Sequence, residues 1–319
     1  MRPSSLVVLG SFPLLACGAP PSGAGVEAAQ GDALSAEAAT SYVDIADYWK
    51  TGADQTAWQA AVANVRLQFD QICGDTFCDG DYANFEPLEL QCGVSSVRGS
   101  VKACTWVFAA SEAIVNAKTG TVHTSAPYYA CAFDPKGTAK QLAAALGATG
   151  SLQAPLPGLT QSLYDVVGEC LQHPIGATPL GAPAAGAYED ASDADGVDQG
   201  AWFAMTGALA QSFDRVCGDT FCEGDYANLS SFGFTCSIGT KSKKIRECRW
   251  VFDGSHSSVV AKTGAVTVNE KAWVCAVPVK GTAQDLMNVL GAAGAVEPVQ
   301  RTLPGETTSV YDALVKCLP

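Results

Sequence analysis

The chain contains the stretch Cys73-Gly74-Asp75-Thr76-Phe77-Cys78, and the same six residue types return at Cys217-Gly218-Asp219-Thr220-Phe221-Cys222. Four further cysteines follow each copy, spaced 144 residues apart between copies for the first three and 147 for the last. The three extra residues of the second copy fall just before Leu303. Whole-domain duplication, rather than a short solenoid repeat, explains a period of this length. The remaining cysteine pairs are Cys92 and Cys236, Cys104 and Cys248, Cys131 and Cys275, and Cys170 and Cys317.

Composition and the repeat together predict the domain boundaries. Residues 1–17 are expected to form a signal peptide and residues 18–50 a flexible tether, since the latter begin rich in Ala, Gly, Pro and Ser. The repeat domains are predicted at 51–172 and 197–319, separated by an acidic Ala/Gly/Pro-rich linker at 173–196. We expect such a linker to let the two domains fold independently and move relative to each other.

Each repeat has the pattern of an α+β domain. Trp58, Val62, Val65, Phe69 and Ile72 recur at spacings of four and three, so they share one face of a helix that opens the repeat. Alternating apolar residues then predict an antiparallel meander of about five strands, and two short helices close the repeat. The predicted architecture is a helix packed on an antiparallel sheet, once in each tandem domain.

Twelve of the thirteen cysteines have a counterpart, and Cys17 alone does not. Even sets of six behind a secretion signal predict disulfides formed in an oxidising compartment. Six cysteines allow fifteen pairings, so spacing alone leaves the pairing open. Our hypothesis joins neighbours across the loop after the first helix, across the first hairpin, and from the last strand to the last helix. In the first repeat these are Cys73 to Cys78, Cys92 to Cys104 and Cys131 to Cys170, with the counterparts joined alike in the second.

The N-terminus resembles that of a bacterial lipoprotein. Arg2 precedes a short apolar run, Leu6 to Leu15, which ends in Leu14-Leu15-Ala16-Cys17 with a small residue just before the cysteine. This resemblance implies cleavage before Cys17, acylation of that residue and, because Gly18 follows, sorting to the outer membrane. The chain would then reach the membrane only through its lipid, facing the periplasm or the cell surface. The alternative is an ordinary secretory peptide that happens to contain a cysteine.

An acidic loop follows the first helix in both copies. Against a calcium loop of the EF-hand type it matches positions 1, 5, 6, 7 and 12, but position 3 is Phe77 and no helix is expected after it. The competing interpretation is an acidic turn stapled by a disulfide, with no metal or other cofactor. The candidate calcium ligands are Asp75, Asp79, Asp81 and Glu86 in the first copy and Asp219, Glu223 and Asp225 in the second.

Neither charge nor motifs indicate an enzyme or a nucleic-acid binder. A formal net charge of −13 disfavours phosphate-backbone contact. None of the three histidines is duplicated, and no G-x-S-x-G, H-E-x-x-H or phosphate-binding loop is present. We therefore predict a lipid-anchored envelope protein with two non-catalytic binding modules, whose ligand is an unidentified envelope or extracellular protein or polysaccharide. The alternatives are an inhibitor of extracellular hydrolases, a calcium-dependent adhesion module and an envelope hydrolase.

Overall fold

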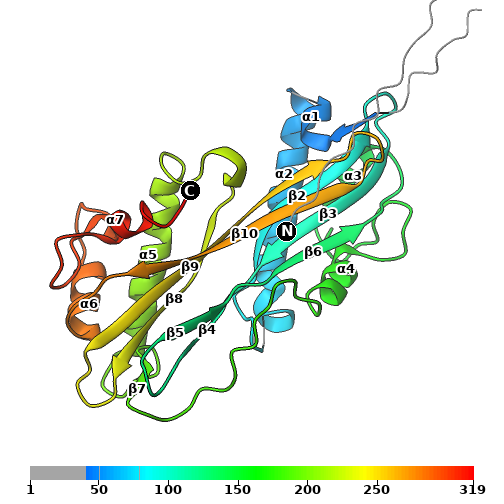
Figure 1. Ribbon diagram of the computed structural model, residues 1–319. Coiled ribbons are helices and arrows are strands. Elements are labelled where there is room, and N and C mark those ends of the chain that lie inside the picture. The colour runs from blue at the N-terminus through cyan, green and yellow to red at the C-terminus, as the bar shows by residue number, and fades with distance from the viewer. Residues whose placement is uncertain (1–40, 50, 79) are drawn as a thin grey trace, which may run out of the picture. The chain divides into compact units, whose positions relative to one another are not determined.

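The computed structural model describes residues 41–49, 51–78 and 80–319, and these form an α+β fold with antiparallel sheets (Figure 1). The expected signal peptide, Cys17, most of the expected tether and Asp79 lie outside the described residues. None of the described helices has the length and apolar character needed to cross a bilayer. We refer to residues 41–175 as half 1 and to residues 188–319 as half 2.

Half 1 packs one long helix on a four-stranded sheet of order β1-β2-β3-β6. A separate two-stranded hairpin, β4-β5, extends beyond this sheet. Two short helices and a third near the N-terminus complete the half, as expected from the sequence except for the third. The elements are β1 (Tyr42–Asp44), α1 (Ile45–Trp49), α2 (Ala53–Thr76), β2 (Glu86–Ser95), β3 (Val101–Ala109), β4 (Glu112–Val115), β5 (Val122–Ser125), β6 (Tyr128–Phe133), α3 (Ala139–Leu146) and α4 (Leu163–Cys170).

Half 2 repeats this order but fuses strands that are separate in half 1. Its sheet has the order β10-β9-β8-β7, and the long β9-β10 hairpin spans the positions of β3 to β6. Pro127 lies at the break in half 1 and lacks the N–H that could donate to the neighbouring strand, whereas its counterpart Lys271 lies within the continuous β9-β10 ladder. The elements are β7 (Tyr188–Asp190), α5 (Gln199–Cys217), η1 (Gly224–Tyr226), β8 (Ser230–Gly239), β9 (Ile245–Val259), β10 (Val266–Val277), α6 (Ala283–Leu290), η2 (Pro298–Gln300) and α7 (Val310–Leu314).

The helix–sheet contact in each half rests on aromatic side chains. Phe69 of α2 lies 4.9 Å, between ring centroids, from Phe108 of β3, and Phe213 of α5 lies 4.8 Å from Phe252 of β9. Both pairs are fully buried. The predicted apolar helix face is confirmed, since Trp58, Val65 and Phe69 are buried while Val62 and Ile72 pack at its margin.

Six disulfides staple the described chain, in the pairs that the spacing suggested. Cys92 and Cys104 are directly opposite on β2 and β3, with Cα atoms 4.1 Å apart. Closing a loop in this way restricts the unfolded chain. For a loop of about 15 residues it raises the free energy of unfolding by roughly 3 kcal/mol. The pairs are Cys73–Cys78, Cys92–Cys104, Cys131–Cys170, Cys217–Cys222, Cys236–Cys248 and Cys275–Cys317.

Two segments expected to be flexible belong to the fold. Residues 41–49, assigned to the tether, supply β1 and the buried Ile45 of α1. Residues 188–194, assigned to the linker, supply β7, which pairs with β8, and the buried Ala191 and Ala194. A strand of three residues is too short to display an alternating apolar pattern. Its backbone hydrogen bonds come from the neighbouring strand, so the sequence does not reveal it.

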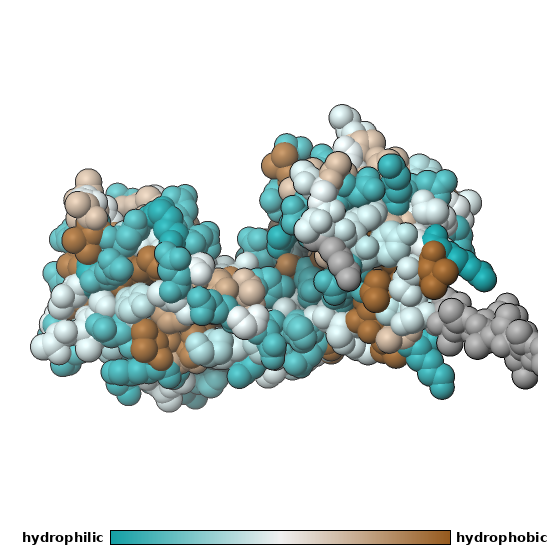
Figure 2. Space-filling model, turned by 90° about the horizontal axis from the view of Figure 1, so that it is seen from above, coloured by the Kyte–Doolittle hydropathy of each residue, from teal (hydrophilic) through white to brown (hydrophobic). Residues whose placement is uncertain are grey.

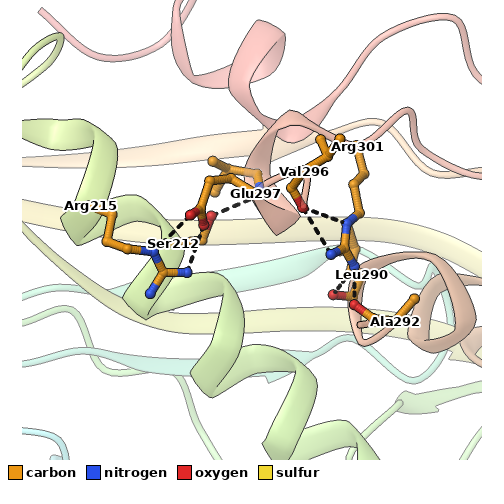
Figure 3. Close-up of polar contacts among 8 residues, drawn as sticks. Ser212, Arg215, Leu290, Ala292, Val296, Glu297 and Arg301 are labelled. Carbon is orange, nitrogen blue, oxygen red and sulfur yellow. Dashed lines mark hydrogen bonds and ion pairs between the residues drawn. The ribbon is translucent and has the colours of Figure 1, made fainter. Parts of the chain in front are cut away.

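The longer loop of half 2 is held by two arginines (Figure 3). Arg301 donates hydrogen bonds to the carbonyl oxygens of Leu290 at 3.1 Å and Val296 at 2.9 Å, and also reaches Ala292. Arg215 of α5 forms an ion pair with Glu297, with 2.6 Å between Nη2 and Oε2. A guanidinium group offers five donors in a fixed fork, which suits several carbonyls on one tight loop. The three additional residues are thus accommodated without disturbing the core.

Candidate functional site

The hairpin tip of half 1 contacts the sheet of half 2. The tip is Ala117-Lys118-Thr119-Gly120, one of the segments repeated in the sequence. The carbonyl of Ala117 accepts a hydrogen bond of 3.1 Å from the backbone N–H of Tyr188 in β7. The carbonyl of Gly120 accepts one from the hydroxyl of Ser237 in β8. Half 1 thus caps the edge of the opposite sheet.

The hairpin tip of half 2 makes the reciprocal contact. Ala261, the counterpart of Ala117, accepts a hydrogen bond of 2.8 Å from the N–H of Tyr42 in β1. Gly264 lies directly against Gly93 of β2, with no room for a side chain between them. Each copy of the Ala-Lys-Thr-Gly segment therefore contacts the sheet of the opposite half. We call these two contacts the latches. The two halves do not divide into separate compact units, because residues 40–319 form one such unit.

Between the latches the outer faces of the two sheets meet in a mixed seam. Its apolar part is Leu88, Val107 and Ala109 of half 1, packed against Phe232 and Val268 of half 2. Its polar part centres on a carboxylate. Glu89 accepts a hydrogen bond of 3.0 Å from the backbone N–H of Ser257. Because the seam contains both buried apolar side chains and hydrogen bonds between the halves, it is part of the folded core.

The seam also holds a buried carboxyl pair that sequence reasoning missed. Asp253 of β9 is fully buried, and neither of its oxygens accepts a hydrogen bond from the described residues. Burial, and then its neighbour Glu270 of β10, raises the pKa of Asp253 far above its ordinary value. Burial also raises the pKa of Glu270. Two neighbouring buried carboxyl groups do not both ionise readily, so the pair favours holding a proton. Half 1 has Ala109 at the position of Asp253, so the repeat gave no signal for this pair.

The acidic loops of the two halves do not assemble a cation site from their described residues. Asp75 lies in the last turn of α2, Asp81 is exposed in the following turn, and Glu86 begins β2. In half 2, Asp219 lies in a turn, Glu223 precedes η1, and Asp225 lies within it. No group of three acidic, histidine or cysteine side chains suitable for a metal occurs among the residues described. Asp79 is outside that set.

The repeated asparagine that ends each acidic loop has a structural role. Asn84 accepts a hydrogen bond of 2.8 Å from the N–H of Ser111, and its amide donates to the Ser111 hydroxyl at 3.0 Å. Asn228 makes the same two bonds to Ser255, at 3.0 and 2.9 Å. Asn228 also donates to the carbonyl of Leu88 across the seam. These bonds explain why both acidic loops end in the same asparagine.

One cleft differs between the halves, and we call it the α5 cleft. It lies between α5 and β8 of half 2, has a volume of about 400 Å³, and is closed on one side by residues at the start of β2. Its walls include two carboxylates, Glu86 and Asp190, and no Lys or Arg among the described residues. Its aromatic residues are Trp202, Phe203 and Phe234, and the Phe203 side chain is 61 % exposed.

The corresponding place in half 1 is filled by an arginine. Arg66 of α2 donates hydrogen bonds to the carbonyl oxygens of Pro87 and of Leu88, the latter at 3.1 Å. The residue 144 positions later is Ala210, which lines the α5 cleft. The strand positions matching Pro87 and Leu88 are Ser231 and Phe232, which also line it. The α5 cleft is therefore the site that Arg66 occupies in half 1, left open because alanine cannot reach it.

A larger cleft of about 600 Å³ lies beside β10 and α7. Its mouth carries Lys280, whose ammonium group lies 3.2 Å from the carboxylate of Glu306, so those two charges neutralise each other. Volume alone does not define a binding site. The α5 cleft is the stronger candidate because half 1 shows what its walls can hold.

No family model, curated protein or solved structure matches the chain. Function therefore has to follow from the chemistry of its own residues. Those residues supply latches, a buried seam and one open acidic cleft.

Proposed function

We propose that the protein is a lipid-anchored component of the bacterial envelope that binds its ligand non-catalytically in the α5 cleft. The anchor is the acylated Cys17, and the outer membrane is its location. The observation that carries the binding proposal is the difference between Arg66 and Ala210, which leaves one of two equivalent sites open. The six disulfides support a compartment outside the cytoplasm.

The face of the molecule drawn in Figure 2 shows no broad apolar docking surface. On the face drawn in Figure 2, hydrophobic residues form separate small patches among hydrophilic ones. A contiguous exposed apolar patch larger than a few hundred Å² would instead mark a protein or membrane interaction site. A preformed cleft in a disulfide-stapled body has little conformational entropy to lose on binding.

Anchoring is tested by replacing Cys17. The Cys17→Ser variant is expected to lose metabolic incorporation of an alkyne-tagged fatty acid and to leave the membrane fraction, because a single cysteine carries the acyl chains. A Cys73→Ser/Cys78→Ser variant is the matched control and should keep both label and location. Continued labelling of Cys17→Ser would contradict the lipoprotein assignment.

Binding in the cleft is tested by filling it. The Ala210→Arg variant should place a guanidinium group where Arg66 places one in half 1, and it should lose the envelope ligand retained by the wild-type chain. Ala210→Ser keeps the space open and is expected to bind as the wild type does. Equal retention by the wild type and Ala210→Arg in detergent-solubilised envelope extract would rule the cleft out.

The same capture experiment distinguishes the other functional classes. Retention that requires calcium would favour adhesion through the acidic loops. Retention of a hydrolase together with loss of its activity would favour an inhibitor. Turnover of an ester or glycoside substrate would identify an enzyme.

A further inference from the structure

We propose that the α5 cleft binds the guanidinium group of an arginine side chain presented by a partner polypeptide. This inference rests on the proposed function, since it names the ligand chemistry of the same cleft. The partner's arginine would enter between α5 and β8 from solvent. It would take the place that Arg66 takes within half 1.

The first argument is the internal precedent. Arg66 uses one guanidinium nitrogen to donate to two consecutive carbonyl oxygens, those of Pro87 and Leu88. Both carbonyls lie where a bulge interrupts the pairing of β2 with β3 between Pro87 and Glu89, and that of Leu88 also accepts from Asn228. The pairing of β8 with β9 is interrupted at the matching place, between Ser231 and Phe234. Both halves thus present backbone of the same kind to the helix, and only half 1 supplies the arginine.

The second argument is charge. Glu86 and Asp190 reach the cleft from different strands, so a cation would be attracted from two sides. The Glu86 side chain keeps contact with solvent, yet its pKa is raised to about 7 by partial burial and by repulsion from Asp70 and Asp214, despite Arg66 nearby. A carboxylate crowded by other acids is stabilised when a cation arrives.

The third argument is shape and polarity. Phe203 exposes an aromatic ring at the cleft, and a planar guanidinium group stacks on such a ring while donating in its own plane. A lysine ammonium is a compact and strongly hydrated charge, and it lacks the planar fork. Anionic ligands would meet two carboxylates with no basic residue among the cleft's described lining.

The proposal is tested by isothermal titration calorimetry of the full chain with an end-capped Gly-Arg-Gly peptide at pH 8. We expect one peptide to bind per chain, and the Gly-Lys-Gly peptide to bind about tenfold more weakly, as for the loss of one charge-assisted hydrogen bond. Ala210→Arg should abolish binding. Glu86→Gln should weaken it at least severalfold, whereas Glu169→Gln, which removes an exposed carboxylate of α4, should not.

Three results would overturn the inference. Equal affinity for the arginine and lysine peptides would show simple attraction to an acidic surface. Undiminished arginine binding by Ala210→Arg would place the ligand elsewhere. If the arginine peptide does not bind at all while Ala210→Arg still loses the envelope ligand, the cleft function stands and the guanidinium chemistry is wrong.

Discussion

Replacing Gly93 by alanine is expected to destabilise the whole described fold, and not only the sheet in which it lies. A Cβ at this position would overlap the backbone carbonyl of Gly264 at the tip of the opposite hairpin. Neither segment can move freely. A disulfide joins Cys92 to Cys104, and the carbonyl of Ala261 accepts a hydrogen bond from the N–H of Tyr42. Overpacking against backbone costs about 1–3 kcal/mol. Because the latch joins both halves, thermal unfolding of Gly93→Ala should remain one transition at lower temperature.

The matched control for this variant is Gly74→Ala. Gly74 lies in α2, and an added Cβ there meets no atom within 4 Å. Alanine in a helix is favoured over glycine by up to about 1 kcal/mol, so this variant should be neutral or slightly more stable. Unfolding of Gly93→Ala at the wild-type temperature, or in two separate transitions, would show that the latch does not couple the halves.

Replacing Asp253 by asparagine is expected to stabilise the protein at neutral pH. Burial raises the pKa of Asp253 in the folded state far above its unfolded value. The folded protein then holds a proton that the unfolded chain releases above pH ~4, so wild-type stability falls as pH rises. Each pH unit costs up to about 1.4 kcal/mol, which gives an upper bound of about 4 kcal/mol between pH 4 and 7. Asparagine has no such proton to lose, and its amide can donate to Glu270.

The wild type and Asp253→Asn should therefore be equally stable near pH 4 and differ increasingly as the pH rises. Chemical denaturation at each pH measures their free energies of unfolding. Asp134→Asn, which replaces an exposed carboxyl after β6, is the control for the loss of one surface carboxyl group. Lower stability of Asp253→Asn than of wild type at pH 7 would show that Asp253 is ionised in the folded protein.

Local patterns predicted most of the architecture. The apolar spacing from Trp58 to Ile72 identified α2, and alternating apolar residues predicted the antiparallel strands that follow it. Such features follow from the period of a single element, which the sequence displays directly. The disulfide pairs followed because each joins elements whose order was already clear.

Contacts between the halves were not predictable in the same way. The Ala-Lys-Thr-Gly repeat at 117–120 was visible, but its role depends on meeting the opposite sheet. Asp253 gave no signal because an acidic residue within an alternating strand ordinarily faces solvent. The α5 cleft appears only when Arg66 and Ala210 are compared in space, because a repeat alignment shows the difference without showing what it opens.

The most direct test of the account is to locate the arginine ligand by hydrogen–deuterium exchange. The full chain with the Gly-Arg-Gly peptide should gain protection at residues 230–235 of β8 and in the cleft-facing turns of α5. Residues 87–91 of half 1, which match 231–235 but do not line the α5 cleft, should not change, because Arg66 already occupies that site. Protection of both segments alike, or protection confined to the larger cleft beside α7, would contradict it.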